Sequence, residues 1–181
     1  MHIYKLYIKI RKPEILAFFS IAYFCFFLMT ACTVSYSFTG ASISPDIKTV
    51  SIPNFPNRAA NFQPVLSQEF TEAMKDKFTS QTNLQLVAAN SDLNFEGEIT
   101  DYKVDPLAIQ QNQTASFNRL TITIRVKFTN NKNPKQDFDN SFSKYEDYES
   151  SKSLDSVEKE LIKQIVKQLV DDIFTKSVVN W

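Results

Sequence analysis

Residues 118–130 read NRLTITIRVKFTN, a strict alternation of apolar and polar side chains. The apolar positions are Leu120, Ile122, Ile124, Val126 and Phe128. The polar positions between them are Arg119, Thr121, Thr123, Arg125, Lys127 and Thr129. Because successive side chains of a strand point to opposite faces, this pattern predicts a β-strand with one face on the core and the other open to water.

The segments on either side of this strand predict partners for it. Upstream, DLNFEGEITDYKV (residues 92–104) alternates, with Leu93, Phe95, Gly97 and Ile99 on one phase and Tyr102 and Val104 on the other. We therefore expect a β-bulge near Thr100 or Asp101. Downstream, NNKNPK (residues 130–135) predicts a turn. The spacing of Phe138, Phe142, Tyr145 and Tyr148 then indicates a strand that pairs back across that turn.

Two amphipathic helices are predicted around these strands. The first starts at Pro64, and its apolar positions recur at helical spacing within residues 64–81: Leu66, Phe70, Ala73 or Met74, and Phe78. The second follows DSVE (residues 155–158), in which Asp155 and Glu158 predict a capping box. Its apolar stripe consists of Val157, Leu161, Ile162, Ile165, Leu169, Ile173 and Phe174, with a water-facing side of Lys159, Lys163 and Lys167.

The remaining strand patterns complete a fold prediction. Residues 47–55 predict a first strand that either lies at a sheet edge or ends at Pro53, and residues 84–88 predict a short second one. The order β-α-β-β-β-β-α predicts an α+β fold, a two-layer sandwich in which a mostly antiparallel sheet packs against two helices. The second face of the sheet would then be left open.

The N-terminal 31 residues have the features of an export signal that ends at a lipoprotein cysteine. Lys5, Lys9, Arg11 and Lys12 precede 17 uncharged residues, 15–31. A helix of that length spans about 25 Å, whereas a bilayer needs ~20 residues. The sequence MTAC (residues 29–32) is similar to a lipobox, in which cleavage precedes a cysteine that receives a lipid. An uncleaved anchor helix is the alternative.

Cleavage before Cys32 predicts a leader at 1–31, a lipidated tether at 32–45 and one domain at 46–181. It removes four of the 20 basic and one of the 20 acidic residues, which leaves a net charge of −3 and argues against a nucleic-acid binder. His2, the single histidine, and Cys25 are also removed. We therefore expect no histidine-dependent nucleophile, no metal site and no cofactor beyond the lipid on Cys32.

Several stretches together resemble the LptE family of lipopolysaccharide-assembly lipoproteins. They are YSFTGASI (36–43), LSQEFTEAMKDKF (66–78), DLNFEGEITDY (92–102), NRLTITIRVKFTN (118–130) and VNW (179–181). The resemblance implies a small α/β sandwich without catalytic activity, anchored in the outer membrane and facing the periplasm. It also implies an LptD-like β-barrel as partner, with lipopolysaccharide as the substance that the two place in the outer leaflet. A structural or pilot lipoprotein of a secretin- or Bam-type machine is the alternative.

Three sets of residues are candidates for function. Arg119, Arg125 and Lys127 share one strand face and could contact lipopolysaccharide phosphates or the barrel, although a solvated face would look the same. The aromatic residues Tyr145, Tyr148 and Trp181 could contact a partner or close the core. The carboxylates Glu96, Glu98 and Asp101 could support a hydrolase, a remote alternative.

Overall fold

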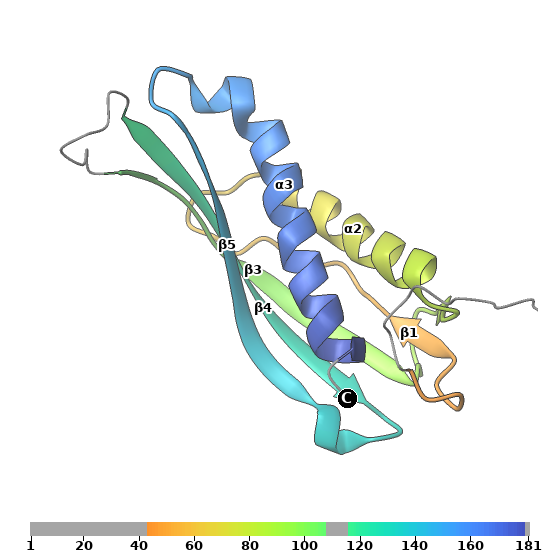
Figure 1. The fold of residues 1–181 in the computed structure, drawn as a ribbon. Helices are drawn as coiled ribbons and strands as arrows, with labels where there is room; N and C mark the ends of the chain where they lie inside the picture. Colours follow the sequence, from red (N-terminus) through yellow and green to blue (C-terminus); the bar gives the residue numbers. More distant parts are fainter. Residues whose placement is uncertain (1–42, 108–115, 180–181) are drawn as a thin grey trace, which may run out of the picture. The chain divides into compact units, whose positions relative to one another are not determined.

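The computed structural model describes residues 43–107 and 116–179, which belong to one compact unit, Thr39–Trp181. Its strands are β1 (Thr49–Ser51), β2 (Gln85–Leu86), β3 (Leu93–Pro106), β4 (Phe117–Asn130) and β5 (Phe138–Glu149). Its helices are α2 (Leu66–Gln81), the short η1 (Pro134–Gln136), α3 (Leu154–Phe174) and the π-helical η2 (Thr175–Val179). The sheet order is β2-β1-β3-β4-β5, and both α-helices cover one face of it (Figure 1). The predicted α+β sandwich and its element order are confirmed.

Strand β4 is the centre of the antiparallel part of the sheet. It pairs with β3 from Asn118↔Pro106 to Asn130↔Leu93, and with β5 from Phe117↔Glu149 to Phe128↔Phe138. The five apolar side chains of its alternating pattern are at most 1% exposed. The predicted face division of this strand is therefore confirmed, because its apolar face lies under the helices.

The predicted bulge lies in β3 at Thr100. Ile99 pairs with Ile124 and Asp101 with Thr123, so Thr100 is the extra residue. The insertion shifts the alternation by one position, which turns Tyr102 to the core, where it is 6% exposed.

The N-terminal part of the sheet is parallel. Strand β1 pairs in parallel with both β2 and β3, so it is an inner strand, and the alternative that placed it at an edge is wrong. It ends at Ser51, two residues before Pro53, and the chain then continues alongside β3. There Ile99 N donates to Pro56 O at 3.0 Å, and Arg58 N donates to Ile99 O at 2.8 Å.

Gly97 permits this close approach. A Cβ atom at Gly97 would lie 2.1 Å from Arg125 O and 2.6 Å from Phe55 Cε1. Any side chain here would collide with the neighbouring strand and with a fully buried ring.

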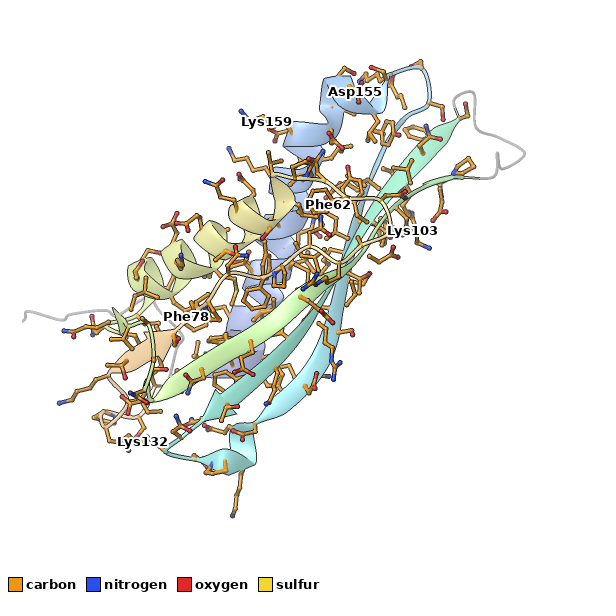
Figure 2. All side chains as sticks on the ribbon, turned by 180° about the vertical axis from the view of Figure 1, so that it is seen from behind. Phe62, Phe78, Lys103, Lys132, Asp155 and Lys159 are labelled. Atoms are coloured by element: carbon orange, nitrogen blue, oxygen red, sulfur yellow. The ribbon has the colours of Figure 1, made fainter. Side chains whose placement is uncertain are left out.

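Both helices bury the faces that the sequence predicts. Helix α2 begins two residues after Pro64 and buries Leu66, Phe70 and Met74 together with Phe78, which points toward the sheet in Figure 2. The Phe78 ring contacts Phe95 of β3 and Phe174 of α3, with ring centroids 4.9 and 5.1 Å apart. One aromatic side chain thus joins both helices to the sheet.

The predicted capping box of α3 is wrong. Ser153 is the N-cap residue, without a side-chain cap hydrogen bond. Glu158 instead accepts a hydrogen bond from the hydroxyl of Tyr102. Burial, with this bond as the next cause, raises the pKa of Tyr102 above its ordinary value. Glu158, which the sequence pattern assigned to the helix cap, instead links α3 to Tyr102 of β3.

A polar network closes the end of the sheet where β1 begins. Asp92 Oδ2 accepts from Lys48 N at 2.8 Å, Thr49 N at 3.1 Å and Thr49 Oγ1 at 3.0 Å. Lys132 Nζ lies 3.2 Å from Asp92 Oδ1. The pKa of Asp92 is lowered to about 2, chiefly by the hydrogen bond from the Lys48 backbone N–H. One carboxylate therefore ties β1, the start of β3 and the predicted 130–135 turn together.

Candidate functional site

The face of β3, β4 and β5 away from the helices, here called the open face, carries the candidate side chains. Cross-strand pairing fixes its membership because directly opposed residues share a face. Its charged members are Glu96, Glu98, Asp101, Lys103 and Asp105 of β3, Arg119, Arg125 and Lys127 of β4, and Asp139, Asp147 and Glu149 of β5. Thr121 and Thr123 of β4 and Ser141, Ser143 and Tyr145 of β5 lie between them.

Arg119 makes two kinds of contact at one end of the open face. Its Nε and Nη2 donate to Asp147 Oδ1 and Oδ2 at 2.7 and 2.9 Å, a bidentate pair. Its Cζ lies 3.5 Å from the centroid of the Tyr145 ring, close enough for a cation–π contact. The hydrogen bonds to Asp147 raise the pKa of Arg119 above its usual range. Asp147 therefore fixes the Arg119 guanidinium, and the guanidinium in turn packs against the Tyr145 ring.

Arg125 repeats the bidentate geometry nearer the other end. Its Nε and Nη2 donate to Asp139 Oδ1 and Oδ2 at 2.9 and 2.7 Å, which lowers the pKa of Asp139. Lys127 Nζ lies 3.6 Å from Glu96 Oε2. These residues, with Gly97 and Glu98, line a shallow hollow of about 250 Å³. The hollow contains three carboxylates and two bases, so it is not a cationic pocket.

The structure brings the three predicted basic residues onto one face but gives each an acidic partner. Lys103 of β3 likewise lies 3.2 Å from Asp105. Sequence reasoning noticed the bases and missed Asp139 and Asp147. The alternation of β5 carried that signal, since both aspartates have the phase of Tyr145, opposite to Phe138 and Phe142.

The predicted interface aromatics Tyr145 and Tyr148 differ in their exposure to solvent. Tyr145 lies on the open face with half of its surface exposed, whereas Tyr148 is 7% exposed and belongs to the core. A surface role therefore falls on Tyr145. Trp181 and Cys32 lie outside the described residues, and their predicted roles stay predictions.

The carboxylates proposed for hydrolysis do not form an isolated acid pair. Glu96 is paired with Lys127, Glu98 stands opposite Arg125, and Asp101 stands opposite Thr123. Within residues 43–107 and 116–179, no three His, Cys, Asp or Glu side chains are grouped to hold a metal ion. None of the described helices is long and apolar enough to cross a membrane.

Comparison with known proteins gives a family. A family model described as LptE, Lipopolysaccharide-assembly, matches residues 47–177, which is well over half of the chain. No curated protein matches.

Among solved structures, similar chains include a minor lipoprotein from Acinetobacter baumannii, at 12% identity and a TM-score of 0.47 over 72% of this chain and 90% of that one. The rare lipoprotein B from Shewanella oneidensis is 11% identical, with a TM-score of 0.44, over 70% of this chain and 92% of that one. A hypothetical protein from Chlamydia trachomatis is 11% identical, with a TM-score of 0.47, over 74% of this chain and 99% of that one.

The family is one of non-catalytic envelope lipoproteins. The matched residues run from the approach to β1 into η2, and include all five strands and both α-helices. This chain belongs to the LptE lipopolysaccharide-assembly family.

Proposed function

We propose that this chain is an outer-membrane lipoprotein that works with an LptD-type β-barrel to place lipopolysaccharide in the outer leaflet. The observation that carries the proposal is the family match across the whole described fold. The open face adds support, because α2 and α3 leave one side of the long strands β3, β4 and β5 to solvent. An uncovered face of this kind suits a module that binds another molecule.

The membrane attachment that we propose is a lipid on Cys32, on the periplasmic side of the outer membrane. Acyl chains contribute about 0.8 kcal/mol per buried methylene, and two or more chains give stable anchoring. Thr33 follows the cysteine, rather than the aspartate that retains many lipoproteins at the inner membrane. Replacing Cys32 with Ser should abolish incorporation of radiolabelled palmitate and release the chain from the membrane fraction. Retention of both label and membrane association would contradict lipidation at this position.

Arg119, Arg125 and Lys127 remain our candidates for contact with lipopolysaccharide or with the barrel. Arg119 and Arg125 already donate to aspartates, so a lipid A phosphate would have to displace a bidentate carboxylate. A protein partner can instead contact these pairs without breaking them. The pairs therefore favour the barrel over the lipid as the neighbour of this face.

Affinity purification from envelope extracts tests the function. A tagged full-length chain should recover an LptD-type barrel in about equal amount, identified by mass spectrometry. Depletion of the chain should lower the amount of mature lipopolysaccharide at the cell surface. Recovery of a secretin or a Bam-type complex in place of the barrel would overturn the proposal and support a pilot or structural role.

A further inference from the structure

The charges of the open face do not balance. Seven carboxylates lie on it (Glu96, Glu98, Asp101, Asp105, Asp139, Asp147 and Glu149) against four bases (Lys103, Arg119, Arg125 and Lys127). All four bases are used in ion pairs, at 2.7 to 3.6 Å. Glu98 and Asp101 have no ion-pair partner within the described ranges. The unpaired charge of this face is therefore negative.

This arrangement disfavours an anionic ligand on the open face. A phosphate would have to replace Asp147 or Asp139 at an arginine, and it would then lie near carboxylates that have no counter-charge. Like charges that face each other across an interface disfavour binding. A basic surface would meet the opposite situation, because its cations could pair with Glu98 and Asp101 while the existing pairs stay intact.

Tyr145 supplies the uncharged part of such a contact. Its side chain is half exposed, its ring lies against the Arg119 guanidinium, and Asp147 holds that guanidinium in place. A tyrosine supported in this way loses little conformational freedom on binding, and tyrosine and arginine are common among the residues that dominate interface energetics.

The helix side carries three lysines without an ion-pair partner. Lys159, Lys163 and Lys167 recur every four residues on the exposed side of α3 and make no ion pair with described residues. Figure 2 shows Lys159 projecting from α3 away from the sheet. Acids of the helices also lack an ion-pair partner among the described residues, among them Glu69, Asp76, Asp155 and Glu160. The helix side therefore carries unpaired charge of both signs, whereas the unpaired charge of the open face is negative only.

We propose that the open face docks on a basic protein surface, with Tyr145 as its aromatic anchor and Glu98 and Asp101 as acceptors for lysine or arginine side chains. The inference rests on the proposed function, which supplies a protein partner. It adds the face that is used and the charge of the surface that is met.

Site-specific photo-crosslinking in cells expressing the full-length chain tests which molecule covers this face. We expect p-benzoylphenylalanine at position 145 to give a protein adduct, and the same group at Lys163 on α3 to give none or far less. An adduct of position 145 with lipopolysaccharide would overturn the inference, and so would equal protein adducts from both positions or none from 145. Mass spectrometry identifies the adduct, so a protein other than a barrel would contradict the proposed function and leave this inference standing.

Charge variants test the chemistry of the contact. The double variant Glu98→Gln with Asp101→Asn should reduce adduct yield from position 145 several-fold, and Glu98→Lys with Asp101→Lys about tenfold or more. Glu69→Gln with Asp76→Asn removes the same charge from exposed positions of α2 and should leave the yield unchanged. Equal yields in all variants, with unfolding midpoints preserved, would show that the partner surface is not basic.

Discussion

The two faces of β4 share one backbone and the same neighbouring strands, yet they are organised by different forces. On the core face, Ile122, Ile124 and Val126 are fully buried under the helices. On the open face, Arg119 and Arg125 are held by bidentate carboxylates and stay partly exposed. Burial of apolar area is favourable wherever it occurs, whereas an exposed ion pair is nearly neutral in stability. The core face therefore holds the fold, and the open face is free to serve binding.

The largest effect that separates the two faces is expected at neighbouring positions of β3. Phe95 is fully buried and its ring centroid lies 4.9 Å from that of Phe128. Phe95→Ala should lower the free energy of unfolding by about 4 kcal/mol. Glu96→Ala, one residue later on the open face, should change it by less than about 0.5 kcal/mol. Urea unfolding followed by circular dichroism measures both, and similar losses would break the comparison.

A second prediction concerns added volume on the core face. Gly97→Ala should cost about 3 kcal/mol because the new methyl group would collide with Arg125 O and the Phe55 ring. The closer contact is with a backbone oxygen, so the additional change Phe55→Leu should not restore stability. Thermal unfolding of the single and double variants checks this, and full recovery in the double variant would assign the strain to the ring.

Between the extremes lies the polar network at the end of the sheet. Asp92→Asn should cost about 2 kcal/mol at neutral pH, because a carboxylate that accepts from Lys48 and Thr49 is replaced. The folded-state pKa is lowered from 3.8 to about 2, so the contribution is complete above about pH 4 and is lost as the pH falls toward 2. The stability difference between wild type and variant should shrink in that window. A difference that is constant from pH 7 to 2 would show that the charge of Asp92 is not the cause.

The smallest effect is expected for ion pairs of the open face. A double-mutant cycle with Arg119→Ala and Asp147→Ala should give a coupling energy of about 0.5–1 kcal/mol, because both side chains are about one-third exposed. The more exposed Lys127–Glu96 pair at 3.6 Å should give a coupling near zero. A coupling above ~2 kcal/mol for either pair would mean that the open face contributes to the fold as the core face does.

A binding measurement tests whether the open face contacts lipopolysaccharide. Arg119→Glu with Arg125→Glu should leave the affinity of the full-length chain for lipopolysaccharide micelles unchanged, if this face meets protein. Circular dichroism confirms that the variant is folded. A large loss of affinity with an intact fold would place the lipid on the open face.

Much of the fold could be predicted because it depends on local periodicity. The alternation in β4, the phase change at Thr100 and the apolar face of α2 each identified an element from its own residues. The capping box of α3 was wrong because local spacing cannot show that Tyr102, distant in sequence, binds Glu158.

The candidate site was predicted only in part, for the same reason. Alternation placed Arg119 and Arg125 on one face, but the pairing with Asp147 and Asp139 depends on the register between β4 and β5. Likewise, the spacing of Tyr145 and Tyr148 marks a strand, and only the register and the position of α3 decide that one is exposed and the other buried.

The sequence by itself determined the α+β architecture, the order of its elements and the apolar faces, since side-chain periodicity and hydrophobicity are local properties that each element must satisfy. Tertiary structure alone decided that β1 pairs in parallel inside the sheet, that Gly97 lies against the Phe55 ring, and that the bases of the open face are already neutralised. Those features require residues far apart in the chain to meet. The energy of each such contact depends on the distance between its residues in space, which their separation along the chain does not determine.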